Sequence, residues 1–158
     1  MKIKEIFNKD EKAGICLDIL HALPDWFAVE EAVQGYAEQA KEQLFFAACL
    51  DETPVGFLSV KFHNAYTAEI YVMGVLESSH RRGVGMALVE AAEARCRERG
   101  VQFLTVKTLD SSAHYEPYDS TRSFYRKAGF LPLEVFTMLW DEDNPCLFLA
   151  KYIGDSAR

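Results

Sequence analysis

The stretch from Glu69 to Gly100 reads EIYVMGVLESSHRRGVGMALVEAAEARCRERG and decides the fold. Its first part, 70–76, is a run of apolar residues typical of a buried strand. A polar turn follows at 77–79. A helix is predicted from Val84, because apolar residues then recur at helical spacing, and Gly100 suits its C-terminal cap. The stretch therefore predicts a strand, a short loop and a long helix.

The loop between this strand and helix reads His80-Arg81-Arg82-Gly83-Val84-Gly85. The first N–H groups of a helix have no partner within it, and the helix dipole places partial positive charge there. Gly83 and Gly85 leave the backbone open to a ligand, and two arginines and a histidine stand beside them. The loop therefore predicts an anion site, best suited to a phosphate or pyrophosphate.

Other phosphate motifs fit this loop less well. A P-loop requires Gly-Lys-Ser/Thr after a longer glycine spacing, and a dinucleotide fingerprint requires a small residue where Leu88 stands. A plain strand-to-helix connection with a solvated basic turn is the structural alternative. The strand before the loop, the helix after it and the arginines within it favour the anion site.

The segment resembles motif A of the GNAT superfamily of acyl-CoA-dependent N-acyltransferases, in which Gln/Arg-x-x-Gly-x-Gly/Ala joins a strand to a helix. His80 departs from the usual Gln/Arg, which affects one side-chain contact. A second segment, Thr121 to Phe130 (TRSFYRKAGF), is similar to the family's Phe/Leu-Tyr-x-x-x-Gly-Phe motif. Two motifs in the right order are far more specific than either alone.

The patterning of the rest of the chain agrees with the fold that this resemblance implies. That fold is of the α/β (α+β) class, with a mixed, mostly antiparallel twisted sheet of about seven strands, about four helices, and a splayed parallel strand pair at the CoA site. We expect a single domain at 1–152 and a frayed tail at 153–158. Strands are predicted at 2–7, 44–50, 55–62, 69–76, 101–109, 131–140 and 146–152, and helices from Asn8 or Asp10 to Pro24, at 30–41, 84–99 and, after a polar loop, at 120–128 capped by Asp119 or Ser120.

The resemblance also implies how acetyl-CoA is held. The backbone N–H groups from Arg81 through Ala87 would bind its pyrophosphate, and those of Met73, Gly74 and Val75 would pair with the pantetheine arm. Gly74 inside a strand otherwise indicates a bulge or a close approach. Tyr118 stands where the family often has an Asn that contacts the pantetheine. The cofactor-binding candidates are Met73, Gly74, Val75, His80, Arg81, Arg82, Gly83, Val84, Gly85, Met86, Ala87 and Tyr118.

Two residues are the catalytic candidates that the resemblance implies. Tyr125 would be the general acid for the departing thiolate, although a tyrosine between Phe124 and Phe130 also suits a core position. Glu69 would be the general base, directly or through a water, although a strand glutamate that faces solvent is an equal alternative. His63, at a strand end, is expected to be a solvated turn residue without a ligand cluster around it.

The acceptor site would lie under the first two helices in this fold. Trp26, Phe27 and Tyr36 would then line it, although aromatic residues here also suit the packing of the helix pair onto the sheet. The acceptor would be a primary amine of a small molecule or peptide. The sequence does not name it.

Composition excludes several classes of protein. A net charge of −7 over 158 residues disfavours nucleic-acid binding. No apolar run is long enough for a membrane span, and the N-terminus lacks an apolar signal region, so we expect a cytoplasmic protein. The spacing of Cys16, Cys49, Cys96 and Cys146 suits neither a metal site nor a disulfide scaffold, so we expect small buried residues and no metal. A homodimer is one arrangement that the fold allows.

The sequence therefore predicts an acetyl-CoA-dependent N-acetyltransferase that works by direct attack in a ternary complex. Two hypotheses stay open beside it. The first is a CoA-binding sensor or interaction module of the same fold without transferase activity. The second is a phosphate-site protein for nucleotides, which would bind ATP or NAD more tightly than CoA.

Overall fold

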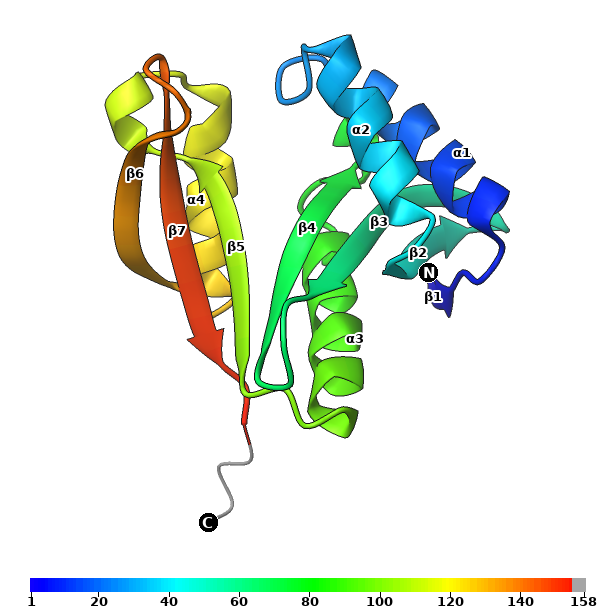
Figure 1. The fold of residues 1–158 in the computed structure, drawn as a ribbon. Helices are drawn as coiled ribbons and strands as arrows, with labels where there is room; N and C mark the ends of the chain where they lie inside the picture. The colour runs from blue at the N-terminus through cyan, green and yellow to red at the C-terminus, as the bar shows by residue number, and fades with distance from the viewer. Residues whose placement is uncertain (155–158) are drawn as a thin grey trace. The chain divides into compact units, whose positions relative to one another are not determined.

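The structure is a computed structural model that describes residues 1–154 (Figure 1). Over these residues the chain forms seven strands and four α-helices in the predicted order. The strands are β1 (Lys2–Glu5), β2 (Leu44–Leu50), β3 (Thr53–Phe62), β4 (Thr67–Val75), β5 (Phe103–Leu109), β6 (Leu131–Asp141) and β7 (Asn144–Tyr152). The helices are α1 (Lys9–His21), α2 (Glu30–Ala40), α3 (Val84–Glu98) and α4 (Pro117–Lys127), with short 3-10 turns η1 (Glu77–Ser79) and η2 (Ser111–Ala113).

The strands form one mixed sheet in the order β1-β2-β3-β4-β5-β7-β6. The pairs β1–β2, β2–β3, β5–β7 and β6–β7 are antiparallel, whereas β4 and β5 are parallel. The parallel register runs from Thr67 opposite Phe103 to Ile70 opposite Val106, although β4 continues to Val75 and β5 to Leu109. The predicted mixed sheet with one parallel pair, flanked by four helices, is confirmed.

The contacts between residues divide the chain into two compact units. The first unit contains residues 1–61 and 71–95. Its core joins α1 and α2 to β2, β3 and β4 through buried side chains that include Leu20, Val33, Phe45 and Phe57. Helix α1 begins where predicted, because the Asn8 side chain accepts a hydrogen bond from the Glu11 N–H at 2.9 Å.

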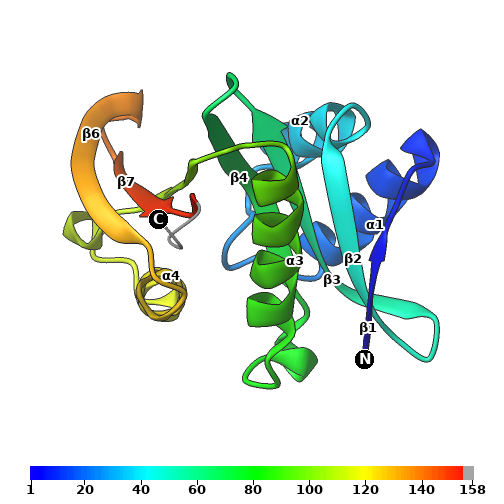
Figure 2. The same ribbon diagram turned by 90° about the horizontal axis from the view of Figure 1, so that it is seen from below.

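Helix α3 packs on the opposite face of the strands in the first unit. Phe45 belongs to the core shared with α1 and α2, whereas the Arg95 guanidinium of α3 lies 5.8 Å from the ring centre of the next residue, Phe46. Successive strand residues point to opposite faces, so the helices enclose these strands from both sides. Figures 1 and 2 show the two views of this arrangement.

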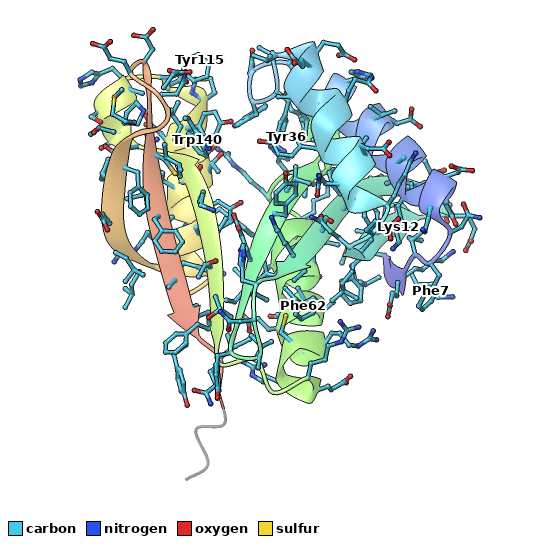
Figure 3. All side chains as sticks on the ribbon, in the orientation of Figure 1. Phe7, Lys12, Tyr36, Phe62, Tyr115 and Trp140 are labelled. Carbon is cyan, nitrogen blue, oxygen red and sulfur yellow. The ribbon has the colours of Figure 1, made fainter. Side chains whose placement is uncertain are left out.

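The second unit contains residues 62–70 and the chain from residue 96 onward. Here α4 lies along β5, and the Arg122 guanidinium donates to the Leu109 carbonyl oxygen at 2.6 Å. Strand β6 is largely exposed, including its Trp140 (Figure 3). Ile153, placed in the predicted tail, is instead buried, and its N–H donates to the Gln102 carbonyl oxygen at 2.7 Å. The prediction of a frayed tail is wrong at Ile153, and residues 155–158 lie outside the described chain.

The start of α4 also differs from its prediction. The helix begins at Pro117 and not at Ser120, and Asp119 lies in its first turn, so neither Asp119 nor Ser120 is its cap. Proline suits the first helical position because its fixed φ is helical and it has no N–H that needs a partner. The predicted loop is therefore shorter, and Tyr118 lies on the helix.

All four cysteines are buried free thiols, as predicted. Cys16 and Cys49 belong to the core of the first unit, where they act as small apolar side chains.

Candidate functional site

The loop that precedes α3 has an unusual backbone. Arg81 has a φ of +63° and Gly83 a φ of +77°, both in the left-handed region. Glycine adopts this region without the steric cost that a Cβ adds. The Ala87 N–H donates to the Gly83 carbonyl oxygen at 3.0 Å and closes the first turn of α3. The N–H groups of Val84, Gly85 and Met86 therefore point out of the start of the helix, where no helical carbonyl precedes them.

The charges around the start of α3 suit an anion. The first turns of α1 and α2 carry acidic side chains, Asp10 with Glu11 and Glu30 with Glu31, whereas the first turn of α3 carries none. Arg81 and Arg82 precede it and are exposed, while Val84 is buried and Gly85, Met86 and Ala87 are half-buried. The positive end of the helix dipole thus follows directly after two arginines, and the first turn of α3 itself carries no carboxylate.

His80 ties this loop to the end of β4. Its Nε2 lies 2.7 Å from the carbonyl oxygen of Val75. A carbonyl oxygen accepts and cannot donate, so Nε2 carries the proton. The imidazole also meets the ring of Trp26 edge-on, with centroids 5.9 Å apart. The departure from Gln/Arg at this position is therefore explained by a contact within the protein.

The three candidates for pantetheine binding lie at the end of β4. Met73 and Val75 are half-buried and Gly74 is buried. A Cβ on Gly74 would meet Leu23 Cδ1 at 3.1 Å and Ile19 Cγ2 at 3.2 Å, so side chains of α1 and of the residues after it pack tightly over this glycine and disfavour a larger residue. This reason differs from the expected bulge or ligand approach, although it leaves the backbone contacts of the strand as a prediction.

The three acceptor-site candidates are half-buried, and two of them, Phe27 and Tyr36, belong to an aromatic chain. Phe27 meets Tyr36 edge-on at 6.1 Å between centroids, and Tyr36 (Figure 3) meets Tyr71 of β4 edge-on at 5.6 Å. The Lys61 ammonium lies 5.7 Å from the centre of the Tyr71 ring. Trp26, Phe27 and Tyr36 also pack against the core, as the structural alternative expects. Tyr71 completes this chain and was not predicted.

Glu69, in the second unit, is buried and contacts the side chains of His63 and Lys107. It is 5% exposed, so the alternative of a solvent-facing glutamate is wrong. Its Oε1 lies 2.7 Å from His63 Nε2, and its Oε2 accepts from Lys107 Nζ at 3.1 Å. His63 is an exposed residue just after β3, as predicted, but its contact with Glu69 was not foreseen. We name His63, Glu69 and Lys107 the Glu69 cluster.

Tyr125 is also in the second unit, on α4. It is 6% exposed and meets Phe124 and Phe130 edge-on at centroid distances of 5.4 and 5.8 Å. Burial raises the pKa of its phenol well above the ordinary value, and Tyr118 adds to the rise. The side chain therefore stays protonated throughout the neutral range. Tyr118, the candidate for a pantetheine contact, is half-buried beside Tyr115, with ring centroids 6.1 Å apart.

Sequence reasoning missed the contacts of Lys107 and His63 with Glu69. Glu69 on β4 pairs with Thr105 on β5, and Lys107 lies two residues further along β5 on the same face. This neighbourhood depends on the register of two strands separated by a helix. The available signal was a lysine inside an otherwise buried strand, which needs a partner for its charge.

Two features are absent from the part of the chain that the structure describes. Within 1–154, no group of three or more His, Cys, Asp and Glu side chains is placed to hold a metal ion. No helix in the same range is long and apolar enough to cross a membrane.

Comparisons with known proteins identify the family. Residues 18–130 match the model of the acetyltransferase (GNAT) family. An uncharacterized N-acetyltransferase of Chlorobaculum tepidum is 30% identical over 124 residues, which cover 71% of this chain and 73% of that one.

Solved structures share the fold. An aminoglycoside 6'-N-acetyltransferase in complex with coenzyme A has a TM-score of 0.78 at 19% identity, with 97% of each chain covered. A GNAT family acetyltransferase from Elizabethkingia anophelis with acetyl-CoA bound has a TM-score of 0.72 at 17% identity, covering 96% of this chain and 97% of that one. With the family-model match, the curated relative and the predicted fold in agreement, this chain belongs to the acetyltransferase (GNAT) family.

Proposed function

We propose that this protein is an N-acetyltransferase that moves an acetyl group from acetyl-CoA to a primary amine, by direct attack in a ternary complex. The observation that carries the proposal is the start of α3. A loop with left-handed backbone at Arg81 and Gly83 leads into a helix whose first turn holds no acidic residue. Related structures of this fold contain coenzyme A or acetyl-CoA, which supports the choice of anion.

The main chain of the first unit would hold the acyl donor. The N–H groups from Arg81 to Ala87 would bind the pyrophosphate, with Gly83, Val84 and Gly85 at the centre, and Arg81 and Arg82 would add charge. Met73, Gly74 and Val75 would pair with the pantetheine, and an N–H near Val75 would polarise the thioester carbonyl. Tyr118 of the second unit is the remaining candidate for a pantetheine contact.

Side chains of the second unit would move the protons. An ammonium must lose a proton before its nitrogen can attack, and Glu69 would receive that proton directly or through a water. The C–N bond forms, the C–S bond breaks, and Tyr125 would give its proton to the departing thiolate. The tyrosinate regains a proton from the nitrogen of the intermediate, so that amide, CoA thiol and one released proton result. Burial keeps Tyr125 protonated until the thiolate forms.

The acceptor is proposed as a primary amine of a small molecule or peptide, with Trp26, Phe27 and Tyr36 as its contacts. Because aminoglycoside acetyltransferases are among the similar structures, aminoglycosides are the first acceptors to assay. A cytoplasmic location and a homodimer stay predictions.

The test has two stages. The thermal midpoint is measured with saturating acetyl-CoA, CoA, ATP and NAD. A ligand at ~100 times its dissociation constant stabilises the fold by about 2.7 kcal/mol, which is several degrees at this size. A panel of aminoglycosides, polyamines and lysine peptides is then assayed for release of CoA thiol.

The outcomes separate the candidate functions. A thermal shift with acetyl-CoA followed by thiol release supports the proposal. A shift without release over the whole panel would favour a CoA-binding module. A larger shift with ATP or NAD than with CoA would overturn the assignment of the α3 loop.

A further inference from the structure

The His63 imidazole of the Glu69 cluster uses one of its two nitrogens in the contact with Glu69. A carboxylate accepts hydrogen bonds, so the 2.7 Å contact between Glu69 Oε1 and His63 Nε2 requires a proton on Nε2. In the neutral imidazole the second nitrogen, Nδ1, then carries a lone pair. The His63 side chain is 36% exposed, whereas that of Glu69 is 7% exposed. The imidazole is therefore the member of the pair that an acceptor amine can reach.

The two oxygens of Glu69 are both engaged. Oε1 faces His63, and Oε2 accepts from the Lys107 ammonium, which lies 6.0 Å from the centre of the Phe148 ring. The Glu69 side chain is only 7% exposed, so an acceptor amine meets the more exposed His63 and Lys107 side chains first. The geometry suits a carboxylate that orients an imidazole and stabilises its charged form.

The backbone around His63 holds the ring in place. The His63 N–H donates to the Thr67 carbonyl oxygen at 2.9 Å across the β3–β4 turn. Inside the turn, the Asn64 side chain accepts from the N–H groups of Tyr66 and Thr67 at 2.8 and 3.0 Å. The turn is therefore fixed by its own hydrogen bonds, and the imidazole keeps one side toward Glu69.

Cys146 of β7 is the other nearby group that titrates. It is fully buried, and burial raises the pKa of its thiol to about 11. It therefore stays a neutral thiol at the pH at which an acetyltransferase is assayed, and does not compete for the proton.

We propose that His63 is the group that takes the proton from the acceptor ammonium, and that Glu69 is a positioning residue acting through it. This inference rests on the proposed function. The ammonium N–H bond breaks, the proton goes to His63 Nδ1, and the resulting imidazolium is held by the Glu69 carboxylate. The neutral amine then attacks the thioester, and His63 later returns its proton to water.

The first experiment removes the imidazole and then supplies one. With an amine that wild type acetylates, His63→Ala lowers kcat about 100-fold or more, because a positioned acid–base group contributes at least that much. Added imidazole restores part of the rate to this variant, since the side chain is open to solvent. Glu69→Gln also loses rate, but imidazole does not restore it.

A matched control is available on the first unit. His21 Nε2 lies 2.9 Å from Glu30 in an exposed histidine–glutamate pair on the surface. His21→Ala leaves kcat unchanged and shows no response to imidazole. Thermal midpoints of all three variants check that each is folded.

The tautomer gives a readout that needs no acceptor. Nitrogen chemical shifts of His63 in wild type are expected to show Nε2 protonated and Nδ1 unprotonated at neutral to alkaline pH, with this preference lost in Glu69→Gln. A wild-type enzyme that acetylates amines while His63→Ala keeps its full rate, or a His63 with the opposite tautomer, would overturn the inference. Absence of transfer by wild type itself would instead overturn the proposed function, and this inference with it.

Discussion

Two regions of this protein differ in the groups that they present: backbone N–H groups in one and side chains in the other. The main-chain region, His80 to Ala87, presents consecutive N–H groups, and its special features are the φ angles of Arg81 and Gly83. The side-chain region consists of His63, Glu69, Lys107 and Tyr125, which lie far apart in sequence. The main-chain region lies in the first unit, and the side-chain region lies in the second.

The difference follows from what each region must do. N–H groups at the start of a helix can stay exposed, because water satisfies them until an anion arrives. A group that moves a proton needs a fixed orientation, and contacts with neighbouring side chains provide it. The main-chain region should therefore be sensitive to backbone conformation, and the side-chain region to single functional atoms.

The largest expected effect comes from removing the hydroxyl of Tyr125 in the side-chain region. Tyr125→Phe keeps the ring between Phe124 and Phe130 and removes the hydroxyl. If Tyr125 protonates the thiolate, kcat falls about 100-fold or more, while the affinity for acetyl-CoA stays the same. Turnover is measured by thiol release and affinity by calorimetry.

The control for this prediction is stability. Because the aromatic packing is retained, the thermal midpoint of Tyr125→Phe should stay close to that of wild type. A rate equal to wild type would remove Tyr125 from the mechanism and leave it as a core residue.

The next prediction asks whether acetyl-CoA binding depends more on the backbone conformation of the main-chain region or on the charge of its side chains. Gly83→Val places a β-branched residue at a φ of +77°, which costs about 1–3 kcal/mol. If the loop leaves this conformation to relieve the strain, acetyl-CoA must restore it, and affinity falls by roughly 5- to 150-fold. The dissociation constant is measured by calorimetry.

Arg82→Ala is the matched variant in the same loop. An exposed charge contributes about 0.2–1 kcal/mol, so its removal should weaken binding by less than about fivefold. If Arg82→Ala weakens binding more than Gly83→Val does, the site depends on side-chain charge and the comparison between the two regions fails.

The same contrast explains what the sequence could predict. The α3 loop was identifiable because its chemistry lies in consecutive residues between a strand and a helix, and both follow from local periodicity. The Glu69 cluster was not, because Lys107 reaches Glu69 through the parallel register of β4 and β5. His63 looked like an ordinary turn residue, since its sequence neighbours say nothing about the direction of its ring.

Local rules also failed where two of them competed. Asp119 and Ser120 are good helix caps, yet Pro117 begins α4, because proline suits the first turn without needing any cap. Gly74 suggested a ligand contact, whereas a Cβ there would meet the side chains of Leu23, just after α1, and of Ile19 in α1, which no pattern within β4 could reveal.

The smallest expected effect concerns stability, and it distinguishes a closely packed glycine, Gly74, from an open one, Gly35, in the first unit. On Gly74 a Cβ would lie 3.1–3.4 Å from three side chains of α1 and its C-terminal end, so Gly74→Ala should destabilise the fold by about 1 kcal/mol or slightly more. On Gly35, inside α2, a Cβ would meet nothing within 4 Å, and Gly35→Ala should stabilise by about 0.5–1 kcal/mol, since alanine favours the helix. Denaturant unfolding of both variants measures whether each substitution lowers or raises the free energy of unfolding. A Gly74→Ala protein that is as stable as wild type but binds acetyl-CoA poorly would mean that this glycine is needed for the ligand and not for α1, and Gly74 would then belong fully to the main-chain region.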